Sequence, residues 1–203
     1  MTRRNGLALL VGFVVTFTLV AGGWLFFSRA NALSPQEKAV DDALAAVIDP
    51  SHYEETMEFL ESSTIKEIGD AIPEEKLESG DLSFTELFSY ASEETQEELL
   101  EDARAISNFH EFVDVEGLST TQQLALEVWA LSLGPSLNVI GTDYNFKGAV
   151  TEDGHFERSK VTGDGDGAIM AQFLPEKFDL VKQDDGQWKI PGEVLLNHWE
   201  DQL

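Results

Sequence analysis

Few side chains in this 203-residue sequence have the types and spacing that catalysis or metal binding requires. The turn Asp164 to Gly167 is rich in carboxylates, but a calcium loop beginning there would need glycine at Ile169 and glutamate at Pro175. No two of the four histidines have the i, i+4 spacing that brings two ring nitrogens to one metal. There is no cysteine, and no serine lies in a glycine-flanked nucleophile elbow. We therefore expect no catalytic, metal or cofactor site.

Aromatic side chains are the better candidates for a binding site. Core packing is their ordinary role, and the alternative is that some of the rings line an interior cavity. The candidate cavity-lining residues are Trp129, Tyr144, Phe146, Phe173 and Trp188. Tyr144 does not form a catalytic pair with the preceding Asp143, because adjacent residues of a strand point to opposite faces.

The N-terminal segment predicts where the chain works. Residues Leu7 to Phe27 carry no charged side chain and follow Arg3 and Arg4. A helix of this length spans a hydrocarbon core of about 30 Å, and the two arginines favour a cytoplasmic N-terminus. We expect residues 1–32 to form a cytoplasmic stub and a single-pass membrane anchor, and residues 33–203 to form one extracytoplasmic domain.

A signal sequence is the alternative to an anchor. Ala30-Asn31-Ala32 has the small-x-small form that signal peptidase accepts, so cleavage after Ala32 would give a secreted protein. The apolar stretch Leu7 to Phe27 is longer than the apolar core of about 7–15 residues that signal peptides usually have. This length favours the uncleaved anchor.

The exported part is strongly acidic. It holds all 38 acidic residues against 10 of the 13 basic ones, a formal net charge of −28. A surface of this sign repels nucleic acid and anionic lipid headgroups, so nucleic-acid binding is excluded. The charge indicates attraction of cations, of a basic partner or of polycationic wall material, or solubility in a saline setting.

The first half of the exported part has helical periodicity. Apolar residues recur at i, i+3 and i+4 after serines that can serve as N-caps. The last of these helices is expected to end at Leu133, before Gly134-Pro135. The expected helices begin at the serines Ser34, Ser51, Ser83 and Ser92, and at about Thr120.

After Pro135 the apolar residues alternate, which indicates strands. A short amphipathic tail from Val194 to Trp199 is expected to dock as a last helical turn. The fold class is therefore α+β, with the helical first half packed on a C-terminal antiparallel β-meander. The expected strands are Leu137 to Ile140, Tyr144 to Val150, His155 to Thr162, Ala168 to Leu174, Phe178 to Lys182 and Gln187 to Ile190, with turns at Asp153-Gly154 and Asp184-Asp185-Gly186.

The string Phe178 to Ile190, FDLVKQDDGQWKI, resembles the last hairpin of the nuclear-transport-factor-two-like superfamily. The resemblance implies a cone-shaped α+β fold in which a curved antiparallel sheet wraps around helices. The helical half, Ser34 to Leu133, is longer than this family usually needs. A helical insertion and a different α+β fold both stay open.

Together these features predict a membrane-anchored domain that binds a partner protein of the cell envelope or a small apolar ligand, without catalysis. One alternative is a cone-fold hydrolase or isomerase with a buried acid, which a carboxyl of strongly raised pKa in a pocket would favour. The other alternative is a structural spacer with neither a pocket nor an exposed apolar patch.

Overall fold

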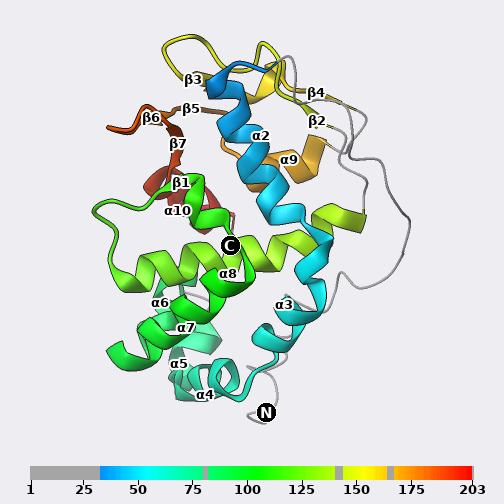
Figure 1. The fold of residues 1–203 in the computed structure, drawn as a ribbon. Coiled ribbons are helices and arrows are strands. Elements are labelled where there is room, and N and C mark those ends of the chain that lie inside the picture. Colours follow the sequence, from blue (N-terminus) through cyan, green and yellow to red (C-terminus); the bar gives the residue numbers. More distant parts are fainter. Residues whose placement is uncertain (1–32, 80–81, 140–143, 164–166, 203) are drawn as a thin grey trace.

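A computed structural model describes residues 33–79, 82–139, 144–163 and 167–202. Helices make up its first part, and the central helix α8 crosses the molecule between a helical end and an end that carries the short strands (Figure 1). The helices of this part are α2 (Pro35–Ile48), α3 (Tyr53–Leu60), α4 (Ser63–Ala71), α5 (Glu74–Ser79), α6 (Phe84–Phe88), α7 (Glu93–Ile106) and α8 (Thr120–Val139), with 3₁₀ turns η1 (Pro50–His52) and η2 (Phe109–Glu111).

Serine N-caps begin several of these helices, as the sequence predicts. Ser34 forms a complete capping box, in which its hydroxyl accepts from the Glu37 amide and the Glu37 carboxylate accepts from the Ser34 amide at 2.7 Å. The hydroxyls of Ser83 and Ser92 each accept an amide hydrogen bond three residues on, at 3.1 Å. These hydrogen bonds satisfy amides that a helix leaves without partners at its first turn.

The predicted capping box at Ser51 is wrong. Residues Pro50–His52 form the 3₁₀ turn η1, and α3 begins at Tyr53 without a side-chain cap. A second N-cap, Ser62, accepts from the Ile65 amide at 3.3 Å and starts α4. The single predicted helix is therefore divided in two, because Ser62 offers the chain a local hydrogen bond that starts a new helix.

Helix α8 continues past the predicted end at Leu133. It passes through Gly134-Pro135 and ends at Val139, so the predicted strand from Leu137 is also wrong as far as Val139. Proline removes only one backbone donor, and a long apolar helix that packs against α2, α6, α7 and α10 outweighs this loss. A Cβ at Gly134 would collide with the Val47 carbonyl oxygen, so glycine permits the close contact with α2. Ile140 lies outside the described residues.

The described strands form three small sheets instead of the predicted single meander. In the first sheet β6 and β7 form an antiparallel hairpin and β1 joins β7 in parallel, whereas the other two sheets pair β2 with β4 and β3 with β5, both antiparallel. The strands are β1 (Val113–Asp114), β2 (Tyr144–Asn145), β3 (His155–Glu157), β4 (Thr162–Gly163), β5 (Lys177–Asp179), β6 (Val181–Lys182) and β7 (Trp188–Pro191), with the 3₁₀ turn η3 (Arg158–Lys160) after β3.

One predicted strand is wrong and another is shorter than predicted, both for local reasons. Residues Gly167–Phe173 form helix α9, since Met170, Phe173 and Leu174 share one helical face and all three are buried. The strand from Tyr144 stops at Asn145, because the Asn145 side chain accepts from the Lys147 amide at 3.0 Å and turns the chain.

Both predicted hairpin turns are confirmed. Gly154 has a φ of 91° and donates to the Thr151 carbonyl at 3.0 Å, and Gly186 has a φ of 87°. Positive φ is the conformation that glycine adopts most readily. The two hairpins also touch, since a Cβ at Gly154 would lie 2.7 Å from the Trp188 ring.

The core centres on α8 and the C-terminal helix α10 (Gly192–Glu200), which confirms the predicted amphipathic tail and extends it. Trp199 of α10 is 1% exposed and stacks on Trp129 of α8 with ring centroids 5.8 Å apart. The rings of Phe109 and Phe173 each lie 6.3 Å from it, and its indole nitrogen donates to the Phe173 carbonyl at 3.0 Å. Trp199 therefore joins η2, α8, α9 and α10.

The fold is thus α+β, with helices packed on small sheets. Within the described residues, no helix has both the length and the apolar character needed to cross a bilayer. The predicted anchor, Leu7 to Phe27, lies outside the described residues.

The two tryptophans of the C-terminal region should differ in their contribution to stability. Trp199→Ala empties a site that is 1% exposed, so we expect it to lower the free energy of unfolding by about 3–5 kcal/mol. Trp188→Ala should cost less, because Trp188 is only half-buried. Thermal denaturation of the detergent-solubilised full-length chain measures both; an equal loss of stability would contradict this account of the core.

Candidate functional site

A buried acidic side chain lies in the middle of α8. Glu127 is 0% exposed, and the rest of the segment Leu124 to Leu131 is apolar. Other helices pack on α8 and shield this carboxyl from bulk water. A buried carboxylate without full compensation is costly, so its surroundings decide its charge.

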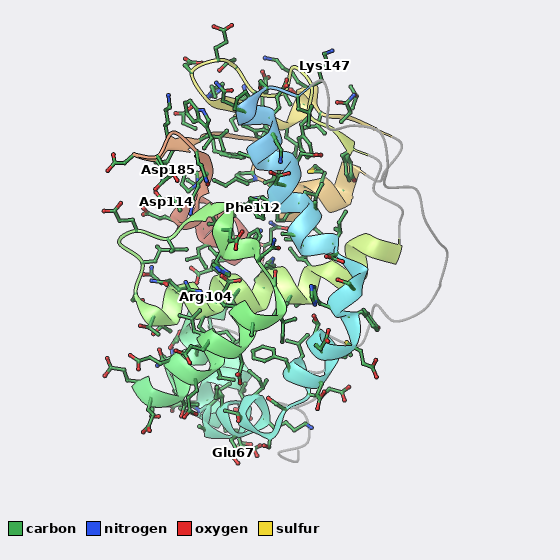
Figure 2. All side chains as sticks on the ribbon, viewed as in Figure 1. Glu67, Arg104, Phe112, Asp114, Lys147 and Asp185 are labelled. Atoms are coloured by element: carbon green, nitrogen blue, oxygen red, sulfur yellow. The ribbon has the colours of Figure 1, made fainter. Side chains whose placement is uncertain are left out.

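Two basic side chains approach the Glu127 carboxyl from different elements. Arg104 on α7 places its Nε 3.7 Å from Glu127 Oε1, and His110 in η2 places its Nδ1 3.8 Å from the same oxygen. Figure 2 labels Arg104, which lies where α7 crosses α8. The arginine is oriented by Gln123, whose side-chain oxygen accepts from the guanidinium at 2.8 Å. Both Glu127 contacts lie within ion-pair range but exceed hydrogen-bond length.

These long contacts leave an unusual group of unsatisfied atoms. Among the described residues, five buried side-chain nitrogen or oxygen atoms have no hydrogen-bond partner, and four of them meet here: Arg104 Nε, His110 Nδ1 and both oxygens of Glu127. The fifth is the indole nitrogen of Trp129. Buried polar groups are nearly always hydrogen-bonded, so such a cluster is a candidate functional site.

The environment shifts the pKa values of both titratable groups in the direction that burial dictates. Burial raises the pKa of Glu127 from 4.5 to about 7, and the nearby Arg104 charge only partly opposes this rise. Burial lowers the pKa of His110, and the positive charge of Arg104 lowers it further. Near neutral pH the cluster therefore holds a carboxyl that can give or take a proton beside a histidine held neutral.

The sequence carries one signal for this site. Glu127 is the one charged residue within the apolar run from Leu124 to Leu131. A charge in the middle of a helix that is apolar on all faces must be buried. Its partners, Arg104 and His110, come from α7 and η2, and no spacing rule predicts that they meet it.

A separate small cavity lies between α2, α3 and α8. Its volume is about 20 Å³, and its lining includes Val47, His52, Tyr53, Ser107 and Gly134. This volume holds one water molecule, whereas pockets for small organic ligands usually measure about 300–1,000 Å³. Glu127 is not part of the lining.

Two of the five aromatic residues predicted to line a cavity pack against the same ring. Trp129 and Phe173 both lie against Trp199. Tyr144 and Phe146 are buried, and Trp188 covers Gly154 on the other hairpin. The small cavity is lined by other residues.

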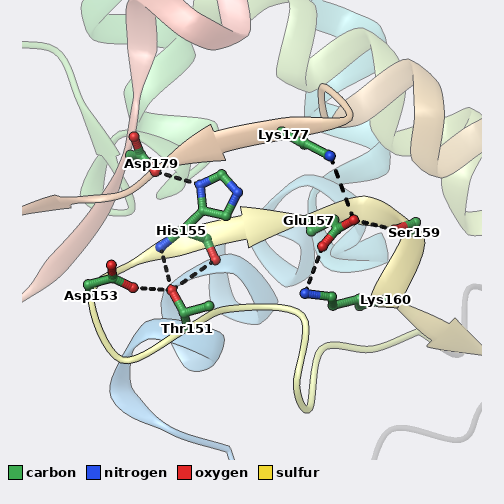
Figure 3. A network of polar contacts seen from close by, with 8 residues as sticks. All are labelled: Thr151, Asp153, His155, Glu157, Ser159, Lys160, Lys177 and Asp179. Atoms are coloured by element: carbon green, nitrogen blue, oxygen red, sulfur yellow. Dashed lines mark hydrogen bonds and ion pairs between the residues drawn. The ribbon is translucent and has the colours of Figure 1, made fainter.

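The polar side chains of the strand-bearing end form pairs at the surface. His155 Nδ1 lies 2.7 Å from an Asp179 oxygen across β3 and β5, and Glu157 on the same strand pairs with Lys160 at 2.7 Å (Figure 3). These pairs lie at the surface, where solvent screens the attraction, so they contribute little to stability. Asp143 and Asp164 to Asp166 lie outside the described residues. Among the described residues, no group of three or more metal-ligating side chains is found.

The excess of acidic over basic residues is largest in the helical part of the chain that precedes η2. Residues 53–106, which contain α3 to α7, include 17 acidic and 3 basic residues, whereas residues 144–203 include 12 acidic and 6 basic ones. We call residues 53–106 the acidic lobe. Glu67 of this lobe and Lys147 of the strand-bearing end lie at opposite ends of the molecule (Figure 2).

Comparison with protein-family models, curated proteins and solved structures found no significant match. The resemblance of the final hairpin to the nuclear-transport-factor-two-like superfamily therefore stays a prediction.

Neutralising Glu127 should change how stability depends on pH. The pKa of Glu127 is about 7 in the folded state and 4.5 in its ordinary state. The folded state therefore loses stability as the pH rises from about 4.5 to about 7, and the loss is complete above about pH 7. Glu127→Gln removes this loss, so the variant should be more stable than the wild type at pH 8, by up to about 3 kcal/mol, and nearly equal at pH 5.

Denaturant unfolding of the full-length chain at both pH values measures this difference. Subtracting the variant from the wild type removes most of the opposite effect of His110, whose lowered pKa costs stability as pH falls below 6.5. Glu98→Gln, on the exposed face of α7, is the matched control and should keep the wild-type pH dependence. A constant difference between Glu127→Gln and the wild type across this range would contradict the burial argument.

Proposed function

We propose that this protein is a membrane-anchored, non-enzymatic binding domain outside the cytoplasm, and that its acidic lobe binds a basic partner protein of the cell envelope. The observation that carries the proposal is the one-ended distribution of charge. Acidic residues needed only for solubility could be spread evenly along the chain, whereas residues 53–106, which contain α3 to α7, hold 17 acidic residues against 3 basic ones.

The lobe's carboxylates are available for a partner. Helix α7 alone presents Glu93, Glu94, Glu97, Glu98, Glu101 and Asp102, all of them exposed. Ion pairs within the described part of the lobe involve Glu86, which lies 3.0 Å from Lys76, and Glu55, which lies 3.6 Å from His52. A dense patch of one sign attracts an oppositely charged surface, speeds association and lowers the cost of self-repulsion when the partner binds.

A protein partner fits these observations better than a small apolar ligand. The cavity between α2, α3 and α8 has room for one water molecule. Binding at an exposed charged surface needs no preformed cavity. The acidic lobe therefore supports the partner-binding part of the hypothesis.

The expected anchor would hold the lobe close to the bilayer. The apolar stretch ends at Phe27, and the capping box of α2 begins at Ser34. The six residues between them reach about 20 Å at most. A partner in the same membrane, or in the adjacent wall, is within reach of a domain held this closely.

One observation favours the enzymatic alternative, a cone-fold hydrolase or isomerase with a buried acid. Glu127 has the raised pKa of about 7 that such an acid needs. A catalytic acid must also touch a substrate, and the described cavity is lined by other residues. Loss of a hydrolase or isomerase activity in Glu127→Gln, with folding retained, would establish this alternative.

Removing charge from the acidic lobe should abolish partner capture. We expect a fourfold variant, in which Glu93, Glu94, Glu97 and Glu98 become glutamine, to lose at least about tenfold in cross-linking to a basic envelope protein, since the attraction depends on summed charge. The measurement is chemical cross-linking in intact membranes followed by quantitative mass spectrometry.

The matched control removes four exposed acidic side chains from the other end of the molecule, in Glu152, Glu176, Asp184 and Glu193. It changes the net charge equally and should retain the partner. Equal recovery of the same proteins from both variants would refute a docking role for the acidic lobe. Recovery of none from the wild type would favour the spacer alternative.

The anchor has its own test. If Leu7 to Phe27 spans the bilayer uncleaved, carbonate-washed membranes should retain the full-length chain, because an integral helix resists alkaline extraction. N-terminal sequencing of the retained and released fractions is the measurement. Recovery of a soluble form that begins at Leu33 would show cleavage after Ala32 and replace the anchored protein with a secreted one.

A further inference from the structure

The cluster around Glu127 joins three elements that belong to different parts of the fold. Arg104 belongs to α7 of the acidic lobe, Glu127 belongs to the central helix, and His110 belongs to η2. Residues after η2 lead directly into β1, which pairs with β7 of the C-terminal sheet. From this arrangement we propose that Glu127 is a proton-controlled switch, pairing with Arg104 when ionised and with His110 when protonated.

The distances place the carboxyl between two nearly equal partners. Glu127 Oε1 lies 3.7 Å from Arg104 Nε and 3.8 Å from His110 Nδ1. A hydrogen bond to either nitrogen needs about 2.9 Å, so a movement of less than about 1 Å completes one contact. These two nitrogens and both carboxyl oxygens of Glu127 are buried without a hydrogen bond, so forming one would lower the free energy.

The ionised carboxylate selects arginine. A guanidinium is always positive and donates through Nε, and a charge-assisted hydrogen bond is roughly twice as strong as a neutral one. Gln123 already accepts from the terminal nitrogen of Arg104 at 2.8 Å, which leaves Nε for Glu127. In this state α7 is tied to α8 by an ion pair.

The protonated carboxyl selects histidine. A carboxylic acid donates a hydrogen bond, and arginine has no acceptor atom. A neutral His110 with its proton on Nε2 presents Nδ1 as an acceptor, and burial keeps the ring neutral by lowering its pKa. In this state Glu127 of α8 is hydrogen-bonded to His110 of η2 and no longer to Arg104 of α7. The central helix is then linked to the segment that leads into the sheet, and not to the acidic lobe.

Charges on the neighbouring elements act on the same pair. Arg104 of α7 favours the ionised form of Glu127 and the neutral form of His110. Glu111 in η2 raises the pKa of His110, whereas Lys189 on β7 lowers it. The switch is independent of the proposed partner, because it concerns the internal contact between α7, α8 and η2.

The tautomer of His110 reports the switch directly. We expect nuclear magnetic resonance of the full-length chain in detergent, with ¹⁵N-labelled histidine and ¹³C-labelled glutamate, to show one shared transition near pH 7. Below it, Glu127 is protonated and His110 Nδ1 has the ¹⁵N shift of an acceptor. Above it, Glu127 is ionised, the Arg104 Nε proton is protected, and the His110 ring is no longer fixed in that tautomer.

Three variants separate the switch from simple histidine titration. Glu127→Gln supplies a permanent amide donor, so His110 should keep Nδ1 as the acceptor and lose the transition near pH 7. Arg104→Gln removes the cation and should move the transition to higher pH. Glu98→Gln is the exposed control and should leave the transition unchanged.

The wild-type titration alone can overturn the proposal. If the Glu127 carboxyl titrates without any change in the His110 ring nitrogens, the two side chains are not exchanging a hydrogen bond. A transition near pH 7 that persists in Glu127→Gln would equally assign it to another group.

Discussion

The burial of α8 by the helices that pack on it is the constraint on which this structure depends. Helices α2, α6, α7 and α10 pack on it, and Trp199 of α10 stacks on its Trp129. With no cysteine in the chain, no disulfide can contribute, so packing must supply the stability. The short strands alone could not, because two- and three-stranded sheets of two to four residues are marginal without helices against them.

Burying a charged group in such a helix destabilises the fold, and Glu127 reduces this destabilisation by becoming neutral. Burial raises its pKa to about 7, so near neutral pH much of the population holds a neutral carboxyl. Replacing it by an apolar residue would remove the cost entirely. An acid that is retained in the core, with Arg104 and His110 beside it, is the feature that a purely structural helix would not need.

The separation of charge along the molecule is the second constraint. Acidic residues far outnumber basic ones in the acidic lobe, and repulsion among its carboxylates opposes compact folding. Helix N-termini relieve a little of this strain, as Glu93 and Glu94 lie in the first turn of α7. A basic partner would relieve more of it, which links the stability of the lobe to its proposed role.

Local hydrogen bonds and local backbone preferences were decided by the sequence itself. Ser34 and Ser92 begin helices, and Gly154 turns a hairpin, because each effect operates within a few residues. Only tertiary structure decided that α8 continues through Pro135, since that choice depends on apolar area buried against distant helices. The same holds for the site: Glu127 was visible as a lone acid in an apolar run, but its meeting with residues of α7 and η2 follows from long-range packing, for which no sequence spacing is a guide.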